Sequence, residues 1–96
     1  MTTTEQSQTW FTLPDGARDW LRPGQRHTFW LPPVSKMSDS DWLAGFDQLT
    51  AWDALVGRMM RGCLFDATED CRRVRKDAEA VAAVAEALAV RLGVER

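Results

Sequence analysis

The sequence predicts an α+β fold in which an N-terminal β-hairpin or small meander packs on a C-terminal helical hairpin of two or three helices. Aromatic and β-branched residues separated by proline–glycine turns fill the first third of the chain. From residue 38 onward, apolar residues recur at helical spacing instead. The length of 96 residues suits one small domain, which we assign to residues 9–96.

The N-terminal third begins with residues 1–8, which are rich in Thr, Gln and Ser and predict a flexible arm. Residues 9–13 and 26–31 carry the β-branched and aromatic signal of two strands. Pro14-Asp15-Gly16 and Pro23-Gly24 predict turns, since glycine takes the positive φ that such turns require. Between them, residues 17–21 suit a short third strand or part of a long hairpin loop.

The helical part begins at Ser38, which predicts an N-cap with Asp41 in the capping-box position. Gly45 weakens the helix that follows, and Thr50 has the features of a second N-cap. Residues 39–61 therefore form either one kinked helix or two short ones. The first piece carries one apolar stripe, namely Trp42, Leu43, Phe46 and Leu49.

A long last helix is predicted over residues 67–92. Gly62 is placed to end the preceding helix as a C′ glycine, and Asp66 to cap the next one. Apolar residues along the last helix alternate in spacing between three and four, which predicts a regular packing seam. The seam consists of Cys71, Val74, Ala78, Val81, Ala85, Leu88 and Leu92.

No pattern in the sequence predicts catalysis, and we expect no catalytic, cofactor-binding or metal-binding residue. His27 is the only histidine, and no local signature pairs it with Cys63 or Cys71 as a base with a nucleophile. The two cysteines lack the short Cys-x-x-Cys spacing of zinc sites. We expect them to be free buried thiols, with a disulfide across a tight helical hairpin as the alternative.

Charge and hydropathy exclude other classes. No uncharged apolar run approaches the ~18 residues of a membrane span, and the N-terminus lacks the features of a signal peptide. We therefore expect a soluble cytoplasmic protein. The net charge of −2 gives no general affinity for nucleic acid. One basic cluster could still bind it, although Glu69, Asp77 and Glu79 are spaced to neutralise that helix face. The cluster is Arg72, Arg73, Arg75 and Lys76.

The five tryptophans are the most specific feature of the sequence. Trp10 and Trp30 have the opposite parity in their strands to Phe11 and Phe29, so large apolar side chains lie on both hairpin faces. We expect the helices to cover one face and a partner or a second copy to cover the other. Because Trp and Met are enriched at interfaces, the predicted protein-binding residues are Trp10, Trp20, Trp30, Met59 and Met60.

The order of features resembles a known family. A polar N-terminus leads to a strand ending Leu13-Pro14-Asp15-Gly16, then to Thr28-Phe29-Trp30-Leu31-Pro32-Pro33, and the chain closes with an alanine-rich amphipathic helix. This layout is similar to that of the small tail assembly chaperones of bacteriophages that infect high-GC bacteria. The resemblance implies a non-enzymatic factor that binds the tape-measure or tail-tube protein during virion assembly in the host cytoplasm.

Two other functions remain open at this point. One is a phage-type inhibitor that occupies the surface of a host defence enzyme. The other is a nucleic-acid-associated regulator that uses the cluster from Arg72 to Lys76. None of the three functions needs a small-molecule substrate. The assembly chaperone and the inhibitor would each bind a protein partner.

Overall fold

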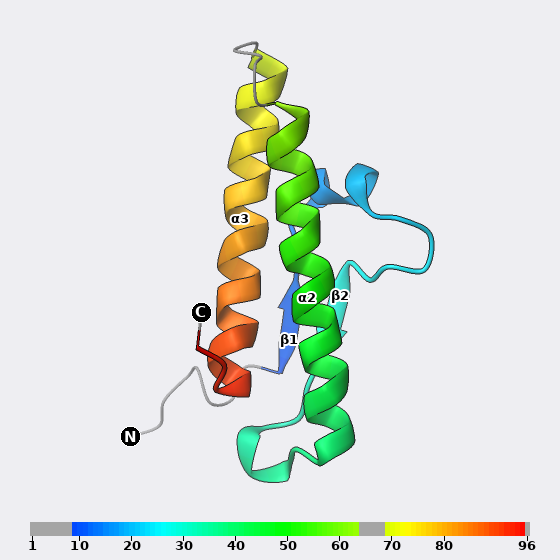
Figure 1. The fold of residues 1–96 in the computed structure, drawn as a ribbon, viewed down its shortest axis with the longest axis vertical. Helices are drawn as coiled ribbons and strands as arrows, with labels where there is room; N and C mark the ends of the chain where they lie inside the picture. Colours follow the sequence, from blue (N-terminus) through cyan, green and yellow to red (C-terminus); the bar gives the residue numbers. More distant parts are fainter. Residues whose placement is uncertain (1–8, 64–68, 96) are drawn as a thin grey trace.

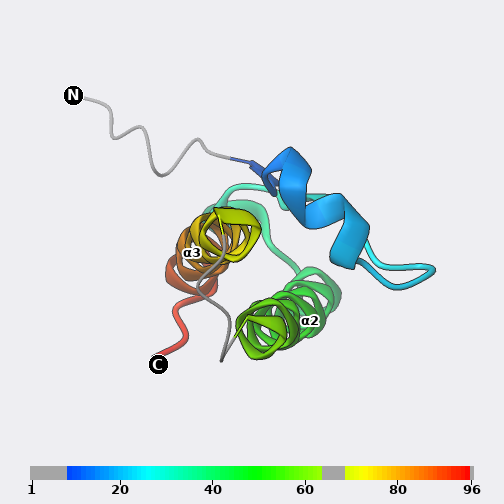
Figure 2. The same ribbon diagram turned by 90° about the horizontal axis from the view of Figure 1, so that it is seen from above.

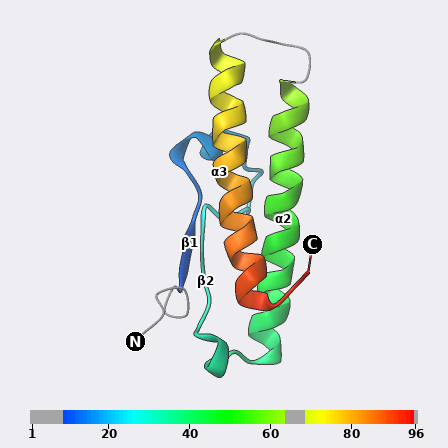
Figure 3. The same ribbon diagram turned by 90° about the vertical axis from the view of Figure 1, so that its left-hand side faces the viewer.

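The computed structural model describes residues 9–63 and 69–95. The elements follow the order β1 (Trp10–Thr12), η1 (Asp15–Trp20), β2 (Thr28–Trp30), η2 (Val34–Lys36), α2 (Asp39–Gly62) and α3 (Glu69–Leu92). The helices α2 and α3 run antiparallel side by side (Figure 1). The hairpin and η1 form a second layer on one side of the helix pair (Figures 2 and 3). The predicted α+β layout is confirmed, whereas the arm expected at residues 1–8 lies outside the described residues.

The hairpin is a two-stranded antiparallel sheet in which Phe11 is paired with Phe29. Its ladder continues past both strands, since the Leu13 N–H donates to the His27 oxygen at 3.0 Å and the Leu31 N–H to the Thr9 oxygen at 2.8 Å. Each regular strand is therefore the centre of a predicted segment. Prolines at 32 and 33 follow directly, as expected of residues that cannot extend a ladder.

The connection between the strands differs from the prediction. Residues 15–20 form a 3₁₀ helix and not a third strand or an irregular loop. Its turns are closed by the Ala17 N–H on the Pro14 oxygen and by the Leu21 N–H on the Arg18 oxygen. Ala17 is fully buried, so this helix contributes to the core. Among the predicted turn glycines, Gly24 has a positive φ of 88°, whereas Gly16 does not.

Of the two alternatives for residues 39–61, one helix or two short ones, the structure has one helix, α2. Its predicted start is confirmed, because the Asp41 N–H donates to Ser38 Oγ at 3.1 Å and the Ser38 N–H donates to Asp41 Oδ2 at 3.0 Å. The second N-cap predicted at Thr50 is wrong. The Thr50 hydroxyl instead donates to the Phe46 oxygen at 3.0 Å, one turn earlier in the same helix.

The packing around Gly45 explains why α2 tolerates a glycine in its second turn. The residue is buried where Leu31 and Leu92 meet α2. A Cβ at this position would lie 2.9 Å from Leu92 Cδ2 and 3.3 Å from Leu31 Cδ1. The missing side chain therefore lets both the hairpin segment and α3 approach α2, which offsets the helix propensity lost at glycine.

The core lies between the hairpin and the two helices. The predicted α3 seam is buried except at Val74, which is only partly buried, while the N-cap predicted at Asp66 lies outside the described residues. Ala78, Ala85 and Ala89 of α3 are fully buried in the same core cluster as larger side chains from α2 and the hairpin. The largest fully buried side chains are Trp52, Phe11, Leu31, Leu55, Met59, Leu88 and Val81.

Hydrogen bonds from both helices hold the ends of β2. Trp52 Nε1 on α2 donates to the Arg26 oxygen at 3.1 Å, just before the strand begins. Arg91 Nη1 on α3 donates to the Pro32 oxygen at 3.2 Å, just after it ends. The Arg91 guanidinium also lies 5.7 Å from the centre of the Phe11 ring. Burial lowers the pKa of Arg91 from its ordinary value.

The two cysteines correct the expectation of free thiols. Cys63 and Cys71 form a disulfide with a Cα–Cα distance of 5.4 Å, and both residues are buried. Cys63 caps the end of α2 and Cys71 lies in the first turn of α3, so the antiparallel packing brings them together. Arg75 Nη2 adds a second link at this end by donating to the Cys63 oxygen at 2.9 Å.

Gly62 has a different role from the predicted C′ glycine. It is the last residue of α2, and Cys63 is the C-cap. A Cβ at Gly62 would lie 2.9 Å from Trp20 Cη2. Its absence lets the Trp20 ring pack against the end of the helix. Within residues 9–63 and 69–95, neither long helix has an apolar stretch sufficient to cross a membrane.

Reduction of the Cys63–Cys71 disulfide should lower the free energy of unfolding by roughly 2–3 kcal/mol, because the bond closes a short loop in the unfolded chain. For a domain of this size, the melting temperature should fall by roughly 10–20 °C. Circular dichroism melts with and without reductant measure the change. The C63S/C71S variant is the control and should not respond to reductant. A wild-type melting temperature that reductant leaves unchanged would contradict this expectation.

Alanine at two α2 glycines should have opposite effects on stability. Gly57→Ala should raise the free energy of unfolding by about 0.5–1 kcal/mol, because the nearest atom, Arg61 Nη1, belongs to a flexible side chain. Gly62→Ala should lose this gain, since its Cβ would displace the Trp20 ring. Urea unfolding of both variants tests the difference. Equal stabilisation by both substitutions would show that Trp20 does not press on Gly62.

Candidate protein-binding surface

The two faces of the hairpin differ sharply in exposure. On the inner face, Phe11 is 2% exposed and Phe29 is 9% exposed. On the outer face, Trp10 is 59% exposed and Trp30 is 47% exposed. Because neighbouring residues of a strand point to opposite faces, burying the phenylalanines turns the tryptophans outward. The predicted two-sided apolar hairpin is thus present.

Trp10 and Trp30 lie directly opposite each other across the hairpin. The bonds at Leu13–His27 and Thr9–Leu31 alternate with the pairs between them, so the Trp10–Trp30 pair is of the non-hydrogen-bonded kind. Side chains approach more closely in such pairs than in hydrogen-bonded ones. The outer face therefore presents two indoles side by side as one apolar platform.

A groove of about 380 Å³ adjoins this platform. Trp10 and Trp30 contribute its indoles, and Asp41 and Ala44 line it from α2. The remaining lining residues are Arg26, Thr28, Phe29 and Leu31. An apolar group with a polar neighbour fits this lining, because one cation and one carboxylate flank the indoles.

The other predicted binding residues do not join this platform. Trp20 lies on η1 and packs inward against the core, and its backbone oxygen accepts a bond from Arg58 Nη2 at 3.2 Å. Met59 is 0% exposed, so the prediction that it contacts a partner is wrong. Met60 is exposed but lies near the C-terminal end of α2, outside the groove lining.

The predicted basic cluster is exposed at Arg72, Arg73 and Lys76, whereas Arg75 is partly buried and bonded to the Cys63 oxygen. Among the residues that the structure describes, the acidic neighbours that we expected to neutralise this cluster do not form ion pairs with it. Within the described part of the chain, no ion pair joins these cations to Glu69, Asp77 or Glu79. The cluster is therefore a strip of cations on the first turns of α3 that makes no direct ion pair within the described residues.

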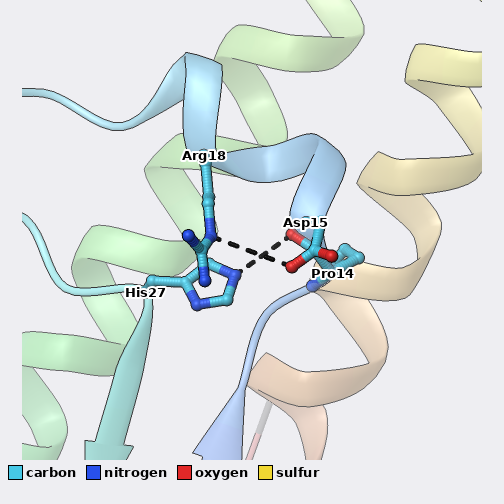
Figure 4. Close-up of polar contacts among 4 residues, drawn as sticks. All are labelled: Pro14, Asp15, Arg18 and His27. Carbon is cyan, nitrogen blue, oxygen red and sulfur yellow. Dashed lines mark hydrogen bonds and ion pairs between the residues drawn. The ribbon is translucent and has the colours of Figure 1, made fainter.

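Within the described residues, His27 contacts the backbone of the hairpin connection and no candidate nucleophile. Its Nε2 lies 3.4 Å from the Pro14 oxygen, beside the exposed ion pair in which Arg18 Nε lies 3.8 Å from Asp15 Oδ1 (Figure 4). Both thiols that could have served His27 are joined to each other. Among residues 9–63 and 69–95, no three His, Cys, Asp or Glu side chains gather where they could hold a metal ion.

Two hydrogen bonds to Gln25, which the sequence did not predict and which we call the Gln25 clamp, hold the loop beside the platform. Gln25 Oε1 accepts bonds from Arg58 Nη2 at 3.1 Å and from the Arg22 N–H at 2.8 Å. Burial, followed by repulsion from Arg22 and Arg61, lowers the pKa of Arg58 from its ordinary value. The clamp fixes the loop before β2 to α2, and with it the position of Arg26.

Sequence reasoning also missed Arg26, Thr28, Asp41 and Ala44 as groove residues. For Arg26 and Thr28 a signal was present, since both share the strand parity of Trp30. Asp41 was recognised only as a capping residue. Its second role depends on α2 starting beside the end of β2, which no local pattern specifies.

Quenching of tryptophan fluorescence by acrylamide should come mainly from Trp10 and Trp30, since these indoles are the most exposed. The W10F/W30F variant should lose most of the quenchable emission and shift its maximum to the blue. Trp52→Phe is the control and should keep the quenchable emission, because Trp52 is 1% exposed. A W10F/W30F variant that is quenched like the wild type would contradict the exposed platform.

No protein-family model, curated protein or solved structure matches this chain. The resemblance to small phage tail assembly chaperones therefore stays a prediction that depends on the order of elements and on Leu13-Pro14-Asp15-Gly16. The tryptophan platform and its groove are the functional candidates that this chain's own residues define.

Proposed function

We propose that this protein is a non-enzymatic interaction factor that binds a protein partner through the Trp10–Trp30 platform. The observation that carries the proposal is the exposure of two directly paired tryptophans on a hairpin whose other face is buried. Folding leaves these side chains in water although they are among the largest apolar groups in the chain. A partner surface that covers them removes the free-energy cost of exposing this apolar area to water.

The size of the effect suits specific recognition. Two indoles at this exposure offer on the order of 200 Å² of surface, because an aromatic side chain covers about 150–250 Å². At about 25 cal/mol per Å², burying that area contributes about 5 kcal/mol before the costs of association. Interface hot spots are enriched in tryptophan for this reason. The platform is therefore large enough to anchor a partner.

The resemblance to tail assembly chaperones supports a more specific role. In that role the partner is a tape-measure or tail-tube protein, and binding takes place in the cytoplasm of the host cell. Cytosolic thiols are usually kept reduced, so the disulfide would be open there. Cys63 and Cys71 are buried and would then pack as small apolar side chains. An inhibitor of a host defence enzyme would use the same platform on a different partner.

One observation favours nucleic-acid binding as the second candidate. Arg72, Arg73 and Lys76 are exposed on α3, and no ion pair neutralises them within the described residues. Such a strip could contact phosphates. We rank it second because the chain carries a net charge of −2 and the strip has no aromatic side chain for base stacking.

Trp30→Ala should reduce partner binding by at least about 30-fold, since an interface anchor of this kind contributes about 2 kcal/mol or more. Pull-down and titration calorimetry against tail-tube protein, tape-measure fragments and host nucleases measure binding. Leu43→Ala is the matched control, because Leu43 is an exposed apolar residue of α2 outside the groove. It should bind like the wild type.

Circular dichroism separates lost binding from lost folding. Trp30→Ala should keep the wild-type helix signal and a cooperative melt. The R72E/R73E variant tests the second candidate, and it should leave protein binding unchanged. Binding that survives in folded Trp30→Ala but disappears in R72E/R73E would overturn the proposal in favour of the basic strip.

A further inference from the structure

The strand β2 has an open edge. Thr28 and Trp30 belong to non-hydrogen-bonded pairs with β1, so their backbone N–H and C=O groups point away from β1. Within the described residues, no hydrogen bond engages these groups, and the sheet has no strand beyond β2. The strand therefore presents a row of unused backbone donors and acceptors.

The groove lies along this edge. Its lining includes Thr28 and Trp30 from the outer face of β2 and also Phe29 and Leu31 from the inner face. A hollow that touches both faces of one strand must lie at the side of that strand. Behind the helix pair, β1 is seen in the gap between α3 and α2, whereas β2 emerges on the outer side of α2 (Figure 1). The groove is therefore open to an incoming extended chain.

Nothing within β2 prevents such pairing. Exposed edges are commonly protected by proline, by inward-pointing charge or by a bulge. The segment Thr28-Phe29-Trp30 contains none of these, and the prolines begin only at Pro32. The edge is short, so a stable addition needs contacts beyond the backbone as well.

We propose that β2 pairs with β2 of a second copy of this chain, antiparallel and about a two-fold axis at Phe29. Thr28 of each copy then exchanges both backbone hydrogen bonds with Trp30 of the other. The two hairpins join into one continuous antiparallel sheet. This pairing does not require the proposed partner. It places the tryptophans of both copies on one outer face, which enlarges the platform.

Charge complementarity favours a second copy over an unrelated strand. Arg26 lies before the start of β2, and Asp41 lies in the first turn of α2, beside the strand's end. A two-fold axis reverses the strand direction, so Arg26 of each copy comes beside Asp41 of the other. In the described part of the chain Arg26 has no ion pair of its own, and Asp41 uses only Oδ2, on the Ser38 N–H.

Two proline variants form a matched test of the edge. Thr28→Pro removes an N–H that points outward from β2 and leaves the hairpin ladder complete. Thr12→Pro removes the equivalent N–H from β1, on the opposite edge. Sedimentation equilibrium over a range of concentrations should show a dimer for the wild type and Thr12→Pro. For Thr28→Pro the dissociation constant should rise roughly tenfold to a hundredfold, because two symmetry-related hydrogen bonds are lost.

Amide hydrogen exchange gives a second readout that needs no variant. Protection of the Thr28 and Trp30 amides should increase with protein concentration, whereas the Thr12 amide should not respond. If circular dichroism shows that a proline variant is unfolded, Arg26→Glu takes its place. It should raise the dissociation constant about tenfold by facing Asp41 with a like charge.

Three outcomes would overturn the inference. The first is a wild type that remains monomeric at all concentrations, with edge amides unprotected. The second is a folded Thr28→Pro that dimerises as well as Thr12→Pro does. The third is protection of the edge amides only after a partner protein is added, which would assign the edge to a strand of that partner.

Discussion

Burial of the inner hairpin face against α2 and α3 is the constraint on which the rest of the structure depends. Strands of three residues cannot form a stable hairpin alone. Cross-strand pairs contribute roughly 0.2–1 kcal/mol each, whereas burying a large apolar side chain contributes roughly 1.5–3 kcal/mol. Phe11, Leu13, Phe29 and Leu31 are all buried. The helices therefore fix the hairpin, and its cross-strand side-chain pairs add only a smaller share.

That same burial determines the candidate surface. With one face committed to the core, strand alternation leaves the opposite face in solvent, and there the sequence places Trp10 and Trp30. The platform stands on a packed layer, and the Gln25 clamp holds the loop before β2. A surface held in place before binding loses little conformational entropy when it meets a partner. Burial of the inner hairpin face thus both supports the platform and leaves its indoles exposed.

Sequence patterns predicted the features that depend on neighbours along the chain. Alternation assigned the two hairpin faces, and the capping box placed the start of α2 at Ser38. Patterns failed where contacts come from distant segments. The disulfide depends on how α2 and α3 pack, and Met59 faces the core whereas Met60 faces solvent, although both are apolar neighbours. The groove needs the start of α2 beside the end of β2, which is set by tertiary packing.

The hydrogen bonds from Trp52 to the Arg26 oxygen and from Arg91 to the Pro32 oxygen have a consequence for strand register. A slip of one residue would exchange the two faces of β2, bringing tryptophan inward and phenylalanine outward. Such a slip would also move both carbonyl groups away from donors fixed on separate helices. The two donors are held at a fixed separation by the helix pair, so both hydrogen bonds can form in only one register of β2.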